Sequence, residues 1–233
     1  VASCAYNTAV KKMKTLKTVT IYALKRGYLL QDPFRDHHFH LTPVDRGFLT
    51  DEEILRIANK ELMIPRLELV RDLFLFSCFT GLAYIDVANL RREHLVTLDG
   101  KAWIMTRRKK TSVESNILLL DIPKAIIEKY SSSTTSQDGK LFPILSNQKM
   151  NAYLKEIADV CGLQKRLTFH LARHTFATMS LSKGVPMESV SKMLGHTNIK
   201  TTQIYARITS KKIEHDMEQL AGKLDKFNEA MGL

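Results

Sequence analysis

The chain has 233 residues, enough for one sizeable hydrophobic core and a second, smaller unit. Hydrophobic residues make up 44% and charged residues 25%, which is typical of globular proteins and argues against disorder. No apolar run reaches the length of a membrane-spanning helix, and no secretion signal is recognisable. The net charge of +11 favours nucleic acid as a partner over a basic solvated surface or an anionic membrane.

Neither the cysteines nor the histidine-rich segment predicts a metal site. The three cysteines lack metal-ligand spacing and are interpreted as reduced thiols; they are Cys4, Cys78 and Cys161. Three histidines lie within His37–His40, but no second ligand cluster accompanies them. We therefore interpret them as solvated linker histidines and expect no metal or other cofactor.

Two units are predicted, residues 1–45 and 46–233. The first is expected to hold one helix over residues 4–27, because apolar residues recur there at helical spacing. Its lysines could form a solvated face or contact phosphates, and the sequence leaves both open. Residues 30–48 lose this periodicity and are interpreted as a linker.

The second unit is predicted to be mainly α-helical with a small antiparallel β-sheet, an α+β fold. Thr50 and Glu53 match a capping box, Pro65 is expected to open a helix that ends at Gly81, and Thr168 can cap another. Strands are predicted over residues 94–98, 102–108 and 115–122, with a two-residue turn at 99–100. Further helices are predicted over residues 84–90, 123–130, 147–161, 169–183, 187–194, 199–208 and 210–226.

Three motifs near the C-terminus carry the candidate chemistry. His170 and Arg173 share a helix face, where arginine can grip a phosphate through two hydrogen bonds and histidine can move a proton near neutral pH. His196 follows Gly195 at an expected turn, and Tyr205 comes nine residues later. Each motif alone is common on protein surfaces or in cores. The three in this order, His-x-x-Arg, then Leu-Gly-His, then Tyr, are unlikely to occur together by chance.

With these motifs, residues 168–205 closely resemble the active-site region of the tyrosine recombinases, the phage-integrase family. The resemblance covers residues 46–226 and includes Gly47-Phe48-Leu49-Thr50, Cys78-Phe79-Thr80-Gly81-Leu82 and Arg108-Lys109-Lys110-Thr111. The segment Thr-Gly-Leu-Ala-Tyr-Ile-Asp is similar to integrases of mobile elements in Bacteroides-type bacteria. The resemblance implies the tyrosine-recombinase catalytic fold, DNA breakage and rejoining without metal or ATP, and a cytoplasmic protein at the bacterial nucleoid.

The resemblance also implies a role for each matched residue. Tyr205 is the nucleophile that forms a 3′-phosphotyrosyl link, which conserves bond energy. Arg173 matches the family's second arginine, and His170 and His196 match the flanking histidines. Lys110 matches the general acid for the leaving 5′-oxygen, against the alternative of a solvated turn lysine.

Two residues near the motifs are expected to act indirectly. His174 directly follows Arg173, so we expect it to point elsewhere on the helix and to hydrogen-bond inside the fold. Asp86 is expected to support the site or cap a helix. Both are therefore predicted to support the residues that contact DNA without contacting DNA themselves.

One position departs from the family. An arginine usually follows Thr-Gly-Leu, but here the residue is Ala83. Losing such a donor typically costs about 100- to 1000-fold in rate. Our hypothesis is that Arg108 replaces it, because residues two apart on a strand face the same way and Arg108 precedes Lys110 by two. Arg91 and Arg92 are rival candidates.

The resemblance implies double-stranded DNA as partner and leaves room for a host accessory DNA-bending protein, with no membrane role. The last helix carries apolar residues that either pack internally or dock on a neighbouring protomer to link a homotetramer on DNA; they are Ile213, Met217, Leu220 and Leu224. Residues 1–30 resemble the end of a core-binding domain, so the chain is expected to be a C-terminal fragment that binds DNA through salt-sensitive contacts.

The favoured function is therefore a site-specific recombinase, an integrase or transposase of a mobile element. A promoter-inverting recombinase shares this chemistry, as does a type IB topoisomerase, which the close motif match disfavours. A DNA-binding regulator that kept the fold and lost catalysis is the alternative from another class. Ala83 favours that alternative, whereas the five retained catalytic candidates argue against it.

Overall fold

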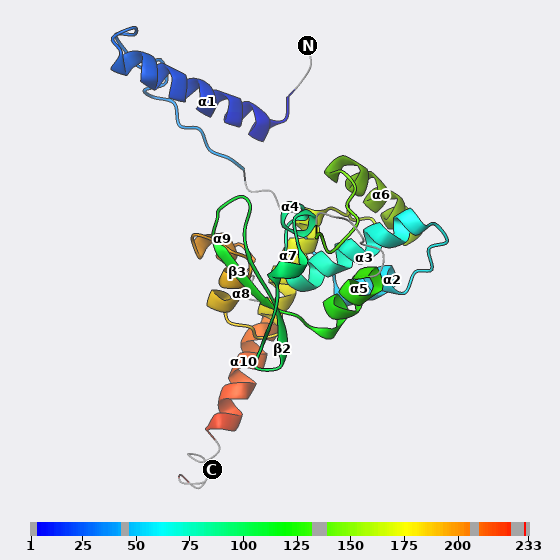
Figure 1. Ribbon diagram of the computed structural model, residues 1–233. Helices are drawn as coiled ribbons and strands as arrows, with labels where there is room; N and C mark the ends of the chain where they lie inside the picture. Colours follow the sequence, from blue (N-terminus) through cyan, green and yellow to red (C-terminus); the bar gives the residue numbers. More distant parts are fainter. Residues whose placement is uncertain (1–3, 43–46, 132–138, 206–209, 225–230, 232–233) are drawn as a thin grey trace. The chain divides into compact units, whose positions relative to one another are not determined.

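The computed structural model describes residues 4–42, 47–131, 139–205, 210–224 and 231 (Figure 1). They belong to two compact units, residues 1–45 and 46–233. None of the helices in these ranges is long and apolar enough to cross a lipid bilayer.

The first unit consists of helix α1 (Tyr6–Lys25) and the irregular segment that follows it. The Asn7 side chain accepts a hydrogen bond from the Thr42 backbone N–H at 3.0 Å and donates one to its carbonyl at 2.9 Å. Lys17 Nζ donates to the Phe34 carbonyl at 3.0 Å. The sequence left open whether the lysines of this helix are solvated or contact phosphates. One of them, Lys17, instead bonds the following segment to α1.

The second unit is built around α3 (Pro65–Thr80), whose C-terminal half is buried on nearly all sides because the apolar run Leu73–Phe76 covers every face of the helix there. The longer helices that pack against it are α2 (Asp51–Ala58), α5 (Asp121–Ser131), α6 (Asn147–Val160) and α7 (Phe169–Ser182). Figure 1 shows α7 beside α3, which places the predicted His-x-x-Arg helix directly on the core.

A three-stranded antiparallel sheet of order β1-β2-β3 completes the unit, so the predicted fold class is confirmed. The strands are β1 (Leu95–Leu98), β2 (Lys101–Arg107) and β3 (Glu114–Leu118). Asp99 and Gly100 both have positive φ, 48° and 72°, as a type I′ turn requires.

Several helix ends lie where the sequence predicts them. Thr50 and Glu53 form the reciprocal capping box, and Thr168 Oγ1 accepts from the Leu171 backbone N–H at 3.1 Å. Gly81 ends α3 in the left-handed conformation, with φ of 70°. Gly81 and Thr168 thus fix the end of α3 and the start of α7, the two helices that meet at the core.

Two predictions differ from the structure. The third strand ends at Leu118, and α5 begins at Asp121, so residues 121–122 are helical. Pro123 thus lies within the first turn of α5, where its missing N–H costs nothing. Within the helix predicted over residues 199–208, the described residues form the short α9 (Lys200–Gln203), and Tyr205 lies in the turn after it. Residues 206–208 of that prediction lie outside the described residues.

The remaining elements are short, apart from α10. They are α4 (Tyr84–Ala88), the 3-10 helix η1 (Arg92–His94), α8 (Met187–Met193) and α10 (Ser210–Lys223). Helix α8 packs against β3, α7 and α9. The C-terminal end of α8 therefore meets the β2–β3 hairpin and the helix that precedes Tyr205.

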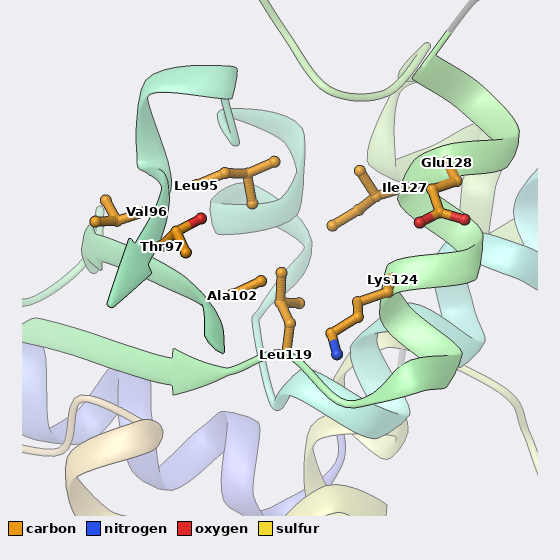
Figure 2. Close-up of a pocket in the computed structure, with 8 residues that line it drawn as sticks. All are labelled: Leu95, Val96, Thr97, Ala102, Leu119, Lys124, Ile127 and Glu128. Atoms are coloured by element: carbon orange, nitrogen blue, oxygen red, sulfur yellow. The ribbon is translucent and has the colours of Figure 1, made fainter. Parts of the chain in front are cut away.

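A cavity of about 250 Å³ lies between the sheet and α5 (Figure 2). Leu95, Ala102 and Leu119 line it from the sheet side and Ile127 from α5, with Lys124 nearby. Its lining contains none of the candidate catalytic residues.

Candidate active site

Arg173 is the most deeply buried cation of the candidate site, with 5% of its surface exposed. Its two terminal nitrogens donate to backbone carbonyls of Gly81, at the end of α3, and of Leu194, at the end of α8. These bonds use two of the five N–H donors of a guanidinium. The side chain is thereby locked in one orientation, and its other donors could bond to a phosphate.

The β2–β3 turn brings a second arginine to the same place. Arg108 Nε lies 3.4 Å from Asp86 Oδ2, and the Lys109 backbone N–H donates to Asp86 Oδ1 at 2.9 Å. The Asp86 side chain is 2% exposed and that of Arg108 is 10% exposed. Asp86, at the buried face of α4, therefore anchors the start of the turn and orients the Arg108 guanidinium.

The Arg108 side chain rests on Gly195. A Cβ atom at Gly195 would lie 2.6 Å from Arg108 Cδ, and the φ of 59° also favours glycine there. The turn needs this glycine both for its backbone conformation and for the passage of the arginine stem.

Three consecutive carbonyls hold the hairpin and Arg173 together. The Met193 carbonyl accepts from Ser115 Oγ on β3, and the Leu194 carbonyl accepts from Arg173. The Gly195 carbonyl accepts from Thr111 Oγ1 in the hairpin turn at 3.4 Å. The backbone after α8 is thus bonded to both elements that carry cations.

Three histidines and the tyrosine gather beside these cations. His170 and His174 on α7 are joined between their Nε2 atoms at 2.9 Å. The His174 ring meets the Tyr205 ring at right angles with centroids 4.7 Å apart, and the His196 ring is stacked at 6.3 Å on Tyr205. Tyr205 is 7% exposed and packs with a small apolar cluster from α7 and α8.

Burial and the repulsion between cations shift the pKa values of two groups in the site. Burial lowers the pKa of Arg173 to about 10, with repulsion from Arg108 as a further cause, so Arg173 stays charged at neutral pH. Burial also lowers the pKa of His196 to about 4, with added repulsion from Arg173 and Arg108. His196 is therefore neutral at neutral pH, and its Nδ1 lies 2.8 Å from Thr202 Oγ1.

The structure brings most of the predicted site residues together, with two differences in detail. Lys110 lies exposed in the turn, because β2 ends at Arg107 and the same-face argument for Arg108 and Lys110 does not apply. His174 was expected to point away from the site, but its four-residue spacing from His170 puts both on one face.

The rival arginines lie elsewhere. The Arg92 guanidinium donates to the Ser131 carbonyl at 2.8 Å, and the Arg91 backbone pairs with Lys140. Ala83 is the N-cap residue of α4, the helix that carries Asp86. Arg108 approaches this same region from the β2–β3 turn, where it contacts Asp86 and lies close enough to Arg173 to lower its pKa. Among the described residues, no group of three or more His, Cys, Asp or Glu side chains could hold a metal ion.

The family model for the phage integrase family matches residues 48–212, more than half of the chain. The chain belongs to the phage integrase family. This recombinase domain is similar to tyrosine recombinase XerC of Oceanobacillus iheyensis, with 26% identity over 85% of this chain and 69% of that protein. It is also similar to tyrosine recombinase XerA of Pyrococcus furiosus, with 28% identity over 73% of this chain and 60% of that protein.

Solved structures of the family share this fold. The integrase of transposon Tn1549, in complex with a circular intermediate DNA, matches with a TM-score of 0.70 and 17% identity over 94% of this chain and 80% of that one. A lambda integrase dimer bound to a core site matches with a TM-score of 0.67 and 19% identity over 84% of this chain and 73% of that one. The predicted family membership is thus confirmed.

Sequence reasoning on this recombinase domain missed several supporting residues. Thr202, fully buried, bonds to His196, and Thr111 and Ser115 bond the hairpin to the turn after α8. The contact between Gly195 and Arg108 was also missed. Most of these contacts join segments far apart in sequence, and short-range spacing carries no signal for them.

We expect Gly195→Ala to impair DNA cleavage by displacing Arg108. Gly162→Ala is the matched control, because Gly162 has a similar φ of 63° but nothing within 4 Å of an added Cβ. Both variants should lose about 1 to 2 kcal/mol of unfolding free energy from the left-handed backbone. Cleavage of DNA by purified protein should fall only in Gly195→Ala; equal cleavage by the two variants would show that the Arg108 position is unimportant.

Proposed function

We propose that this chain is the catalytic part of a site-specific DNA recombinase, an integrase or transposase of a mobile element. The observation that carries the proposal is the pair of buried arginines beside Tyr205. Two cations that repel each other are held by Asp86 and by backbone carbonyls, and a phosphate between them would attract both, most strongly in the transition state, where its negative charge grows.

In the proposed reaction, the Tyr205 hydroxyl oxygen attacks a backbone phosphorus and the bond to the 5′-oxygen breaks. The hydroxyl proton of Tyr205 passes to one of the flanking histidines, His170 or His196. The product is a 3′-phosphotyrosyl link, and the 5′-oxygen takes a proton from Lys110. Rejoining reverses these steps with the 5′-hydroxyl of a partner strand, so bond energy is conserved and no ATP is used.

Arg173 and Arg108 are assigned to the non-bridging oxygens, where negative charge grows in the transition state. Arg108 supplies the cation that the family places at the position of Ala83. This assignment is supported by the Asp86 contact and by the seat on Gly195. His196, neutral in the free protein, is assigned to hydrogen bonding with the phosphate, whose charge would raise its pKa.

Double-stranded DNA is the proposed substrate. The net charge of +11 fits a polyanion, and the family relatives crystallised with DNA share the fold. Binding through phosphates predicts strong salt dependence, which an equilibrium titration at several salt concentrations would measure.

A covalent trap tests the proposal and identifies the target sequence in the same experiment. The protein is incubated with a pool of nicked duplexes of randomised sequence, in which the nick lets the cleaved fragment diffuse away. Adducts that survive denaturant are isolated, their DNA is sequenced, and the modified peptide is identified by mass spectrometry. An adduct on Tyr205 is expected, and absence of any adduct would instead favour the DNA-binding regulator.

We further propose that α10 docks on a neighbouring protomer in a homotetramer. Met217, Leu220 and Leu224 recur at helical spacing and are 57%, 44% and 39% exposed, whereas an internal packing role would bury them. A host DNA-bending protein remains a candidate accessory factor for the assembled complex.

Truncation after residue 209 should weaken assembly on DNA without unfolding the catalytic domain. The expected result is unchanged thermal unfolding and a shift from tetramer toward monomer on captured duplexes, measured by light scattering. A control variant replaces exposed Leu55 with Ala, which should leave assembly unchanged. A normal tetramer from the truncated chain would refute the docking.

A further inference from the structure

His174 links the proposed nucleophile to His170. Its Nε2 lies 2.9 Å from His170 Nε2, and its ring meets the Tyr205 ring edge to face at 4.7 Å. Of the two histidines that contact Tyr205, His174 has the nearer ring, since the His196 centroid is 6.3 Å away. The residue therefore touches two members of the proposed catalytic set at once.

The bond between the two Nε2 atoms restricts the protonation of both rings. One nitrogen must carry the hydrogen and the other must offer its lone pair, so two imidazolium rings cannot face each other in this arrangement. While the bond lasts, a phosphate contact through a ring nitrogen of His170 has to use Nδ1. His174 thus decides both how the His170 ring is turned and which nitrogen it can present.

The core does not need His174 to hold α7. The neighbours Leu171, Ala172, Phe176 and Ala177 are buried in the two apolar clusters, whereas His174 is only half-buried. Its side chain contacts both His170 and Tyr205. We propose that His174 is a positioning residue for strand cleavage, which orients His170 through the shared Nε2 hydrogen bond. This inference rests on the proposed role of Tyr205 as nucleophile.

Two substitutions separate the two contacts of His174. His174→Gln keeps an acceptor and a donor near His170 but removes the ring against Tyr205, whereas His174→Phe keeps the ring and removes the bond. On a duplex captured by wild type, His174→Phe should slow adduct formation about 10- to 100-fold at saturating protein, because His170 loses its orientation. His174→Gln should recover most of that loss, and duplex binding should be unchanged in both.

A double-mutant cycle shows whether His174 acts through His170. In the His170→Phe background, His174→Phe should slow cleavage by less than about threefold, because the partner of the bond is already gone. Independent, multiplicative effects would overturn the proposal. So would wild-type cleavage by His174→Phe, or losses in both variants that follow a lowered unfolding temperature. Failure of wild type to form any adduct would instead refute the proposed function.

Discussion

Tyr205→Phe is expected to form no covalent adduct with any duplex that wild type captures. The substitution removes only the hydroxyl oxygen that would bond to phosphorus, and no other group can form the same link. The phenyl ring should keep the packing against the apolar cluster and the two histidines, since Tyr205 is 7% exposed. Adduct yield is measured by denaturing electrophoresis, and binding by a titration.

Tyr153→Phe provides the matched control for this prediction. Tyr153 is a tyrosine on α6 whose ring contacts the guanidinium of Arg66, a residue outside the candidate site. The control should form adduct like wild type. An adduct that persists in Tyr205→Phe would mean that another residue is the nucleophile.

Replacing Arg108 is expected to slow cleavage by about 100- to 1000-fold, the usual cost of removing one donor from a charged transition state. Arg108→Met is the sharpest form of the test, because it keeps an unbranched stem on Gly195 and removes only the guanidinium. Single-turnover adduct formation on a captured duplex measures the rate. The rate for Arg108→Lys should lie between those of wild type and Arg108→Met, since lysine keeps the positive charge but lacks the planar guanidinium with its paired donors.

Arg107→Met is the control for general loss of positive charge. Arg107 is the preceding residue, its side chain is 72% exposed, and it pairs with Glu114 on the neighbouring strand. It should weaken binding slightly through salt-sensitive contacts and leave the rate at saturation unchanged. If Arg108→Met cleaves as fast as Arg107→Met, the missing arginine at Ala83 has another substitute or none.

Stability must be followed in the Arg108 variants. Asp86 is 2% exposed at its side chain, and without Arg108 it keeps the Lys109 backbone bond but loses its ion pair. Removing one partner of a buried pair typically costs about 3 to 5 kcal/mol. Asp86→Asn combined with Arg108→Met would relieve the uncompensated charge and restore stability without restoring cleavage.

The sequence predicted the order of elements because local signals agree with the fold. Capping residues at Thr50 and Thr168, the Asp99-Gly100 turn and the left-handed Gly81 each act within a few residues. Strand and helix boundaries near Pro123 were less accurate, because the apolar run before it suits either structure.

The site was less predictable, because its geometry depends on long-range contacts. Arg108 was suggested from an alternation rule that does not hold in a turn, yet it reaches the site through Asp86 and Gly195, which are distant in sequence. For His174 the signal was present, since four-residue spacing on a helix puts it beside His170. Only the tertiary fold could show that Tyr205 lies against it.

The acceptors that tie the hairpin and Arg173 to the turn after α8 are all main-chain carbonyls, from Met193 to Gly195. Main-chain atoms are the same whatever side chain is attached. Residues 193 and 194 can therefore vary among relatives within the limits of core packing, while the alignment of hairpin and arginine persists. The donors lack this freedom, because each is a particular hydroxyl or guanidinium. Among relatives, we therefore expect substitutions at the acceptor positions 193 and 194 and few at the donor positions Thr111, Ser115 and Arg173.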